Sequence, residues 1–364
     1  MPTSVLYVSH TPEFKGSAVS LYQLMTGLDR ARFRPVAAFS KPGPMLEKLS
    51  SLGVPAYVLA RRGLIGIGLV REVMRLINAE GIGLVHLNSA VPFSKYAGIA
   101  AKLSGVPVVW HVREDPEGSR VRKNGPWVRL LSDRIFAVST DIEVYFSSSG
   151  KALKIYNGVD TDVFRPGLDG GSFRDRYGIP VNAFVFGMVG TIEPRKGVLS
   201  FLEAAETLLA ARPSAWFLIV GSGQRENEDE LLKYLEARPA LKARTTLAGR
   251  VTDVPLAMAA LDVLVMPSLW EGFPRALIEA MACGRPSIAT QVGEVGNILE
   301  DGRTGFVIPK AEVSAISGAM LRCMEMGDDL LEMGRLAREA AVERFGIKRH
   351  IDLVMDEYDK ITAR

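Results

Sequence analysis

The sequence predicts an α/β protein with two doubly wound parallel sheets. Short apolar runs alternate along the chain with segments of helical spacing, as they do in βαβ units. A length of 364 residues suits two or three domains, and 48% apolar residues can fill large cores. The alternation pauses after residue 155 and restarts near residue 184, so we expect one sheet on each side of this break.

The first predicted domain covers residues 1–160. Its first strand, Ser4–Val8, leads into a helix from Ser17 to Leu28. Further strands are expected at Pro35–Phe39, Ala56–Leu59, Leu84–Leu87, Pro107–Trp110 and Arg134–Val138.

A boundary is predicted in the segment Ile155–Pro166, where Asn-Gly and Arg-Pro pairs indicate turns. The second predicted domain covers residues 161–345, with helices at Val198–Leu209 and Glu228–Leu235. A last helix, Lys348–Thr362, lies in a segment (346–364) that we expect to pack back on the first domain. The strands of the second domain are expected at Phe184–Val189, Ala215–Val220, Thr245–Ala248, Val263–Met266 and Ser287–Thr290.

Composition favours a cytoplasmic protein. The two cysteines, Cys283 and Cys323, argue against a disulfide framework and for a reducing compartment. The first ten residues lead directly into a strand, without the features of a signal peptide, and no apolar stretch is long enough to span a membrane. The net charge of +3 is uneven, because residues 1–155 carry +9 and the remainder −6. The basic half is either ordinary solvated surface or a surface that approaches an acidic acceptor or membrane.

The most informative segment runs from Val263 to Thr290. A buried strand ends at Met266, a turn follows, and Pro274 suits the first position of a helix that ends near Cys283. Gly284 is the expected cap of that helix. Loops at the carboxyl ends of strands bind ligands in open α/β sheets, and helix N-termini suit anions. The carboxylates of Glu271 and Glu279 can accept hydrogen bonds from hydroxyls, so the segment fits an anion next to a polyol.

This segment, Glu271-Gly-Phe-Pro followed by Glu279-Ala-Met-Ala-Cys-Gly-Arg-Pro, resembles the Glu-x7-Glu signature of retaining glycosyltransferases of family four. The resemblance covers nearly the whole chain and implies the GT-B fold, two Rossmann-like domains facing across a cleft. It also implies transfer of a hexosyl group from a nucleoside diphosphate sugar to an acceptor hydroxyl, with retention at the anomeric carbon.

The resemblance assigns the donor site to loops of the second domain. Gly190-Thr-Ile-Glu-Pro-Arg-Lys-Gly resembles the phosphate-binding loop, in which Arg195 and Lys196 would neutralise the diphosphate. Thr191 stands where many members carry an arginine, so binding of the phosphates depends more heavily on Arg195 and Lys196. The residues implied to contact the base are Gly249, Arg250 and Val251.

The same resemblance assigns the donor sugar to Glu271, with the backbone of Gly272, Phe273 and Pro274, and the ribose to Glu279. It implies front-face displacement, in which the departing phosphate oxygen takes the acceptor proton. No metal and no cofactor are expected, so Asp160-Thr-Asp162 is interpreted as part of the linker rather than as the metal-binding motif of the GT-A fold.

In the first domain, the family's glycine-containing first loop corresponds to Gly16, followed here by Ser17 instead of a second glycine. Its backbone would approach the phosphates and the acceptor. The resemblance favours His111 over His86 as the histidine that faces the donor sugar, because His86 lies inside a strand. Arg113 and Glu114 would border the acceptor channel, or Glu114 would instead orient a basic neighbour.

The predicted partners are a nucleoside diphosphate sugar, with UDP or GDP as the nucleotide, and a glycan or lipid-linked acceptor; nucleic acid is not expected. The activity would serve the synthesis of cell-surface polysaccharide or glycolipid. Two alternatives are a non-catalytic relative that binds a sugar nucleotide or serves as a scaffold, and a GT-B sugar-nucleotide epimerase.

Peripheral attachment to the inner membrane face is a separate hypothesis. The segment 61–77 mixes basic and apolar residues, so it either lies on a bilayer or forms a loop leading into a sheet-covering helix from Leu69 to Asn78. Residues 120–123 add a second basic cluster, and both would face an anionic, lipid-linked acceptor.

Overall fold

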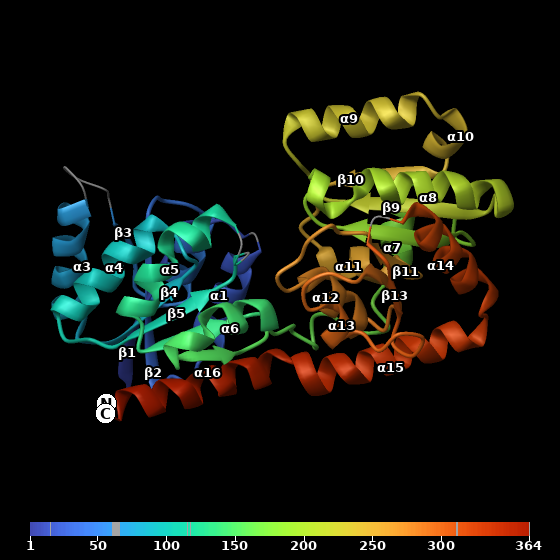
Figure 1. Cartoon of the computed structure of the whole chain (residues 1–364). Coiled ribbons are helices and arrows are strands. Elements are labelled where there is room, and N and C mark those ends of the chain that lie inside the picture. The colour runs from blue at the N-terminus through green and yellow to red at the C-terminus, as the bar shows by residue number, and fades with distance from the viewer. Residues whose placement is uncertain (15, 60–65, 115, 117, 311, 364) are drawn as a thin grey trace. The chain divides into compact units, whose positions relative to one another are not determined.

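A computed structural model describes the whole chain except residues 15, 60–65, 115, 117, 311 and 364 (Figure 1). It divides into two compact units. Unit 1 comprises Met1–Gly158 and Ile347–Arg364, and unit 2 comprises Val159–Gly346. The boundaries predicted from the sequence lie within two residues of these positions.

Unit 1 is built on a seven-stranded parallel sheet with the strand order β3-β2-β1-β4-β5-β6-β7. The six predicted strands are confirmed. The seventh, β7, was missed because only two apolar residues, between Lys151 and Lys154, mark it. The strands are β1 (Thr3–Ser9), β2 (Phe33–Phe39), β3 (Ala56–Val58), β4 (Ile82–Asn88), β5 (Val108–Val112), β6 (Arg134–Ala137) and β7 (Ala152–Lys154).

Helices cover both faces of this sheet. One core joins the sheet to α1, α2 and α16, while α3, α4 and α5 pack side by side as another layer. The predicted helix within 61–77 is α3, and residues 61–65 of that segment lie outside the described residues. The helices are α1 (Ser17–Gly27), α2 (Pro44–Ser51), α3 (Ile67–Glu80), α4 (Pro92–Leu103), α5 (Ser119–Leu131), α6 (Thr140–Phe146), η2 (Ser147–Ser149) and α16 (Ile347–Thr362).

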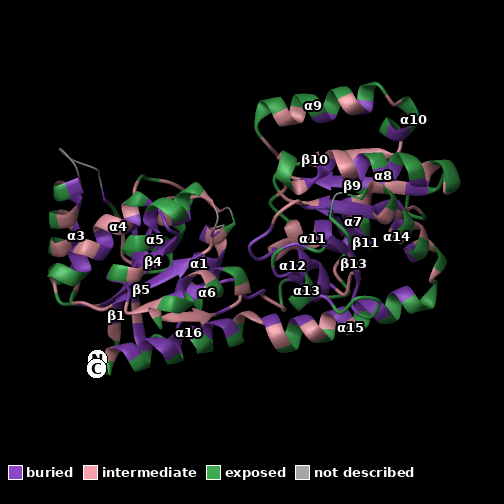
Figure 2. Cartoon of the chain, in the orientation of Figure 1, coloured by how far each residue is buried: buried purple, intermediate pink, exposed green. Residues whose placement is uncertain are grey.

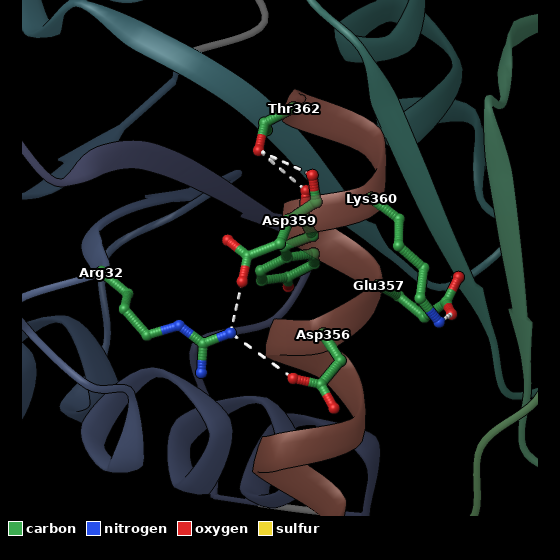
Figure 3. Close-up of polar contacts among 7 residues, drawn as sticks. Arg32, Asp356, Glu357, Asp359, Lys360 and Thr362 are labelled. Carbon is green, nitrogen blue, oxygen red and sulfur yellow. Dashed lines mark hydrogen bonds and ion pairs between the residues drawn. The ribbon is translucent and has the colours of Figure 1, made fainter. Parts of the chain in front are cut away.

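The last helix, α16, packs on unit 1 although the whole of unit 2 precedes it in sequence. Its buried residues, including Ile351, Val354 and Tyr358, recur at three- and four-residue spacing, so one apolar stripe faces the core. Ion pairs flank this stripe (Figure 3): Arg32 lies between Asp356 and Asp359, and Glu357 accepts from Lys360 on its own helix. Arg134 at the start of β6 also pairs with Glu357, at 3.0 Å.

Unit 2 repeats the architecture with a six-stranded parallel sheet of order β10-β9-β8-β11-β12-β13. The five predicted strands are confirmed, and the three-residue edge strand β13 was missed. The strands are β8 (Phe184–Val189), β9 (Ala215–Val220), β10 (Thr245–Gly249), β11 (Val263–Met266), β12 (Ser287–Thr290) and β13 (Phe306–Ile308).

The helices of unit 2 include the predicted α8, α9 and α12. Pro274 is the cap of α12 rather than its first residue, and the helix begins at Arg275. Gly284 follows α12 at a φ of 70°, which suits a helix C-terminus. The helices are α7 (Gly170–Arg176), η3 (Pro194–Lys196), α8 (Val198–Ala211), α9 (Arg225–Glu236), α10 (Pro239–Lys242), α11 (Val254–Ala259), α12 (Arg275–Ala282), α13 (Val295–Ile298), α14 (Val313–Glu325) and α15 (Asp328–Phe345).

Candidate active site

The strand order of unit 2 has a switch point between β8 and β11. From β8 the chain proceeds outward to β9 and β10, and from β11 it proceeds in the opposite direction to β12 and β13. The loops that leave β8 and β11 therefore diverge at their carboxyl ends, which is where open α/β sheets bind ligands. These two loops are the ones in which the sequence predicted the phosphate-binding pair and Glu271.

The two loops are joined by their backbones. The Leu269 amide donates to the Arg195 carbonyl at 2.7 Å. Gly197 has a φ of 72°, and a Cβ on it would lie 2.2 Å from the Pro267 carbonyl oxygen. Only glycine accommodates both this conformation and this close approach. Arg195 and Lys196 are thereby held beside the turn that carries Glu271.

The carboxylate of Glu271 is the centre of the cluster. Its Oε1 accepts from Lys196 Nζ at 2.5 Å and from Ser268 Oγ at 2.8 Å, while its Oε2 lies 4.0 Å from Arg195. The side chain of Glu271 is 7% exposed, against 20% for Lys196. Because charge-assisted hydrogen bonds strengthen away from water, Lys196 holds this side chain firmly in its orientation. Behind it lies a cavity of about 30 Å³ between β8 and β11.

Arg195 is the more accessible cation of the pair, with 44% of its side chain exposed. Its guanidinium pairs with Glu193 at 2.6 Å and lies 5.7 Å from the ring centroid of Trp270. An exposed pair of this kind contributes little to stability, so its partner can be exchanged for an arriving anion at low cost. The arrangement thus contains one cation oriented by a buried carboxylate and one that faces water.

Glu279 lies on α12, where Arg275 one turn earlier donates to its Oε1 at 2.9 Å. Burial raises the pKa of this carboxyl, and the charge and hydrogen bond of Arg275 offset part of that effect. A buried carboxylate held by one cation retains lone pairs for hydroxyl donors.

A third loop, after β12, supports the Glu271 turn from behind. Gly293 has a φ of 49°, and a Cβ on it would lie 1.8 Å from the Glu271 carbonyl oxygen. Thr290 Oγ1, at the end of β12, donates to the Ser268 carbonyl at 2.5 Å. Glu294, which follows Gly293 in the chain, is 1% exposed, and its carboxylate accepts from Asn297. The position of Glu271 is therefore determined by backbone contacts on both sides.

The remaining donor residues predicted in unit 2 lie at the same edge of the sheet. Gly190 follows β8, Gly249 ends β10 at a φ of 64°, and Arg250 and Val251 come directly after it. The residues of the turn itself, Gly272, Phe273 and Pro274, are buried. Contacts of these residues with a donor stay predictions. A Cβ on Gly190 would meet none of the described atoms within 4 Å. The tightly packed glycine is Gly221, because a Cβ there would lie 1.7 Å from the Gly190 carbonyl oxygen.

In unit 1 the structure places His111 within β5 and not at an open edge, with no exposed surface. Its ring packs 5.4 Å from His86 and 6.3 Å from His350, measured between ring centroids. His111 is the last but one residue of β5 and pairs with Asn88, the last residue of β4, so it lies nearer the carboxyl ends of the strands than His86, as expected. Its side chain is nevertheless fully buried, as is that of His86. Burial lowers the pKa of both rings well below the usual value, and Arg113 adds to the effect, so both are neutral. A contact between His111 and the donor stays a prediction.

Arg113 is the first residue beyond β5, and it is held by three neighbours. Its Nε donates to Asn88 Oδ1 at 2.8 Å, another nitrogen donates to Asn157, and a third lies 3.2 Å from His111 Nδ1. The Glu114 carboxylate accepts from the Ala90 amide at 3.0 Å. Glu114 thus supports the loop after β4, a role that the sequence left undecided.

Gly16, the predicted glycine of the first loop, precedes α1 with a φ of 44°. A Cβ on it would meet none of the described atoms within 4 Å, so the backbone angle accounts for the glycine within this unit. Its predicted approach to a ligand is untested.

Sequence reasoning missed several residues that build the unit 2 site, namely Ser268, Arg275 and Gly293. Ser268 and Arg275 lie inside the segment Val263–Thr290. Ser268 could have been identified as a short polar residue just after a buried strand. Nothing local marked Gly293, because its partner is 22 residues away in the chain.

Comparisons with known proteins agree with this geometry. A family model described as "Glycosyl transferases group 1" matches residues 183–326, and one described as "Glycosyltransferase Family 4" matches residues 14–163. A relative in Escherichia coli, a UDP-Gal:alpha-D-GlcNAc-diphosphoundecaprenol alpha-1,3-galactosyltransferase, is 30% identical over 79% of this chain and 78% of its own. The chain is a family 4 glycosyltransferase.

A second relative supports the same family. The lipopolysaccharide core biosynthesis mannosyltransferase LpsB of Rhizobium meliloti is 27% identical, over 80% of this glycosyltransferase and 90% of LpsB.

Among solved structures, the Anabaena protein Alr3699/HepE, crystallised with UDP, superposes with a TM-score of 0.87. It is 22% identical, and the match covers 98% of this chain and all of that one. The lipopolysaccharide glycosyltransferase WaaG superposes with a TM-score of 0.76 at 15% identity, over 99% of this chain and all of WaaG. These likenesses establish the GT-B fold that the sequence predicted.

The described residues contain no group of three or more histidine, cysteine, aspartate or glutamate side chains arranged to hold a metal ion. Among the described helices, none combines the length and the apolar character needed to cross a bilayer.

Proposed function

We propose that this glycosyltransferase moves a hexosyl group from a UDP-sugar to a hydroxyl of a lipid-linked or glycan acceptor, with retention and without a metal ion. The observation that carries the proposal is the cluster of Arg195, Lys196 and Glu271 at the switch point between β8 and β11. Two cations beside a buried carboxylate fit a diphosphate joined to a polyol.

The residues of the cluster and Glu279 divide three roles between them. Lys196 and Arg195 neutralise the diphosphate as the bond between the anomeric carbon and the phosphate oxygen breaks. Glu271, held in place by Lys196 and Ser268, accepts hydrogen bonds from donor-sugar hydroxyls. Glu279 accepts from the ribose hydroxyls.

The bond changes balance without a protein nucleophile. The acceptor oxygen bonds to the anomeric carbon on the face that the phosphate leaves, and the acceptor proton passes to the departing phosphate oxygen. The protein supplies positioning and charge stabilisation, which together lower the barrier to such a transfer most strongly.

The names of the comparison proteins support the choice of donor and acceptor. The E. coli relative takes UDP-galactose and an acceptor on diphosphoundecaprenol, and HepE was crystallised with UDP and with UDP-glucose. We therefore favour UDP over GDP. A lipid-linked acceptor also implies work at the cytoplasmic face of a membrane.

The test is turnover of a panel of UDP- and GDP-sugars by the purified protein, with and without EDTA, using lipid-linked and free glycan acceptors. We expect UDP release from one donor, unchanged by EDTA, and a product with the donor's anomeric configuration by NMR. Glu271→Ala should abolish release, whereas Glu236→Ala, an exposed glutamate of α9, should not.

Other outcomes would separate the alternatives. Donor binding without release or transfer would indicate a non-catalytic relative. Inversion at the anomeric carbon, or loss of turnover in EDTA, would overturn the corresponding part of the mechanism. Conversion of the donor to an epimer would indicate an epimerase.

A further inference from the structure

A cavity of about 520 Å³ lies where the strands β5, β6 and β7 of unit 1 begin. Its wall includes Pro107 just before β5, Arg134 at the start of β6 and Lys151 just before β7. The predicted acceptor residues Arg113 and Glu114 follow β5, so they lie at the other end of the same parallel strands. We call this space the β5–β7 cavity. Its volume is within the range of small-molecule sites.

The last helix of the chain, α16, forms one side of the cavity. The buried side of α16 (purple in Figure 2) includes Glu357 and Ile361, and Ile361 lines the cavity. Glu357 Oε2 lies 3.0 Å from Arg134 Nε, and Glu357 Oε1 accepts from Lys360 Nζ at 2.6 Å (Figure 3). Two cations thus share one carboxylate, so Glu357 leaves part of the charge of Arg134 uncompensated.

Lys151 adds a second cation to the cavity. Its Nζ donates to the Arg129 carbonyl at 3.0 Å, near the C-terminal end of α5. This contact holds the ammonium at the negative end of a helix dipole, but it supplies no full opposite charge. Within the described part of the chain, no carboxylate pairs with Lys151. The side chain is half-buried, and a charge withdrawn from water without a counterion costs free energy.

The acidic residue of the wall, Asp133, is already engaged. Its Oδ2 accepts from the Lys102 ammonium at 2.6 Å and from the Val108 amide at 2.7 Å. The charge of Asp133 therefore holds the loop before β6 against the start of β5. Three of the side chains that line the cavity are cationic and one is anionic, so the cavity carries an excess of positive charge.

The chemistry of this wall suits a phosphate group. Among the described residues, the two terminal nitrogens of Arg134 have no hydrogen-bond partner. A guanidinium can donate to two phosphate oxygens at once, and a nearby ammonium can donate to a third. The remaining wall includes the apolar side chains of Val106, Pro107 and Ile361, which can cover the uncharged part of a ligand.

We propose that the β5–β7 cavity binds a soluble, phosphorylated small molecule of about the size of a sugar phosphate, with its phosphate on Arg134 and Lys151. This site goes beyond the proposed function, because it lies away from the predicted acceptor residues and shares no residue with the donor cluster. A ligand bound there contacts the starts of three strands and the end of α16. It therefore holds the last helix on the sheet of unit 1.

The test is hydrogen exchange read by mass spectrometry on the full chain, with inorganic phosphate, pyrophosphate or glucose 1-phosphate at millimolar concentration. Physiological salt suppresses unspecific attraction between charges. We expect at least one probe to protect peptides that cover residues 104–109, 132–137 and 149–153 and the end of α16. Titration calorimetry with the same probe then gives its affinity.

Two variants remove the proposed phosphate contacts. Lys151→Gln and Arg134→Gln should each weaken binding of the probe at least about tenfold, the usual effect of losing a hydrogen bond to a charged group. Lys151→Gln is the decisive variant if Arg134→Gln fails to fold. Its side chain makes one hydrogen bond within the described residues, so its melting temperature should stay close to that of the wild type.

Matched controls come from lysines of the same elements. Lys154, at the other end of β7, is also half-buried, and its ammonium donates to Thr140 Oγ1 at 3.0 Å. Lys360 is the other cation on Glu357 and does not line the cavity. Lys154→Gln and Lys360→Gln should both bind the probe as the wild type does.

Several outcomes would overturn the proposal. These are no binding of any probe, protection confined to the loops after β8 and β11, and equal affinity of Lys151→Gln, Arg134→Gln and the wild type. Protection of the cavity by phosphatidylglycerol vesicles but by no soluble probe would make it a lipid headgroup site instead. Donor turnover by Lys151→Gln should equal that of the wild type, so loss of this site leaves the proposed function standing.

Discussion

The two units share one topology but hold opposite kinds of chemistry around their switch points. In unit 2, the loops after β8 and β11 bring Arg195, Lys196 and Glu271 into an ion cluster that is partly open to water. In unit 1, strands β4 and β5 carry the buried neutral rings of His86 and His111. One unit keeps charge available for a ligand, and the other uses polar groups to fix its own packing.

Histidine usage sharpens this contrast. All four histidines of the chain belong to unit 1, and unit 2 has none. His86 Nδ1 lies 2.6 Å from the Tyr358 hydroxyl, which donates to Tyr7, and His350 Nδ1 lies 2.6 Å from the Tyr156 carbonyl oxygen. These contacts connect α16 to the sheet. Acid should therefore weaken unit 1 in a range where it does not weaken unit 2.

The largest expected effect concerns the ion cluster. Glu271→Gln and Lys196→Gln should each lower kcat/KM about 100- to 1000-fold, the usual cost of removing one group that stabilises developing charge. Steady-state kinetics with the identified donor measures this, with Glu236→Gln as the control. Rates within threefold of the wild type, with unchanged melting temperatures, would contradict the assignment of the site.

Acidification should lower the stability of unit 1 but not that of unit 2. The pKa values of His86 and His111 are lowered in the folded state, so the unfolded chain binds protons first as pH falls below about 6.5. The stability of unit 1 is therefore complete above this pH and decreases below it, by about 1.4 kcal/mol per pH unit for each ring.

Hydrogen exchange read by mass spectrometry at pH 7.0 and 5.5, corrected for the intrinsic rate, tests this expectation. Peptides from β4, β5 and α16 should lose protection, while those from β8 and β11 keep theirs. Equal loss of protection in both units would show that the histidine network does not control the acid response.

A smaller effect should follow from a change that leaves every charge in place. Gly293→Ala places a methyl group against the Glu271 carbonyl, so the turn must shift, and we expect about a tenfold loss of kcat/KM. Gly302→Ala is the matched control, since its φ is also positive at 73° but the added Cβ meets none of the described atoms. Both variants should lose stability through the positive φ, and Gly293→Ala should lose more because of its clash with backbone. Equal kinetics for the two would refute the role of Gly293.

The smallest effect concerns Glu279. Burial raises its pKa, so as pH falls the folded chain binds this proton at a higher pH than the unfolded chain does. The free energy of unfolding therefore decreases as pH rises from about 4.5 through the raised pKa. Glu279→Gln should remove this slope and slightly stabilise the protein at pH 7. Urea midpoints of variant and wild type at pH 5 and pH 7 measure the difference, and a constant difference would contradict the assignment.

Strong local signals account for what could be predicted of the fold. The run Val263–Met266 and Gly284 define a strand–turn–helix unit through chain geometry alone, and the structure contains it as β11 and α12. The edge strand β7 escaped detection because only two apolar residues mark it, whereas β13 was overlooked although its three residues are all apolar. Pro274 moved by one position, from first helical residue to cap, which is within the usual uncertainty of helix ends.

The candidate site was predictable to the extent that its residues occur in contiguous motifs. Arg195, Lys196, Glu271 and Glu279 were identified in this way, and the structure brings the first three together across 75 residues of chain. The side-chain environment of His111 was not predictable, because the orientation of a strand residue depends on which face the helices cover.

The sequence by itself determined the α/β class, the two sheets and the family motifs, because these depend on local periodicity and on contiguous residues. The tertiary structure alone decided that Lys196 pairs with Glu271, that Gly293 supports the turn behind it, and that His111 packs into a core. It also left Trp127 and Leu130 exposed on α5. Such facts depend on contacts between segments far apart in the chain, and a linear pattern carries no measure of those distances.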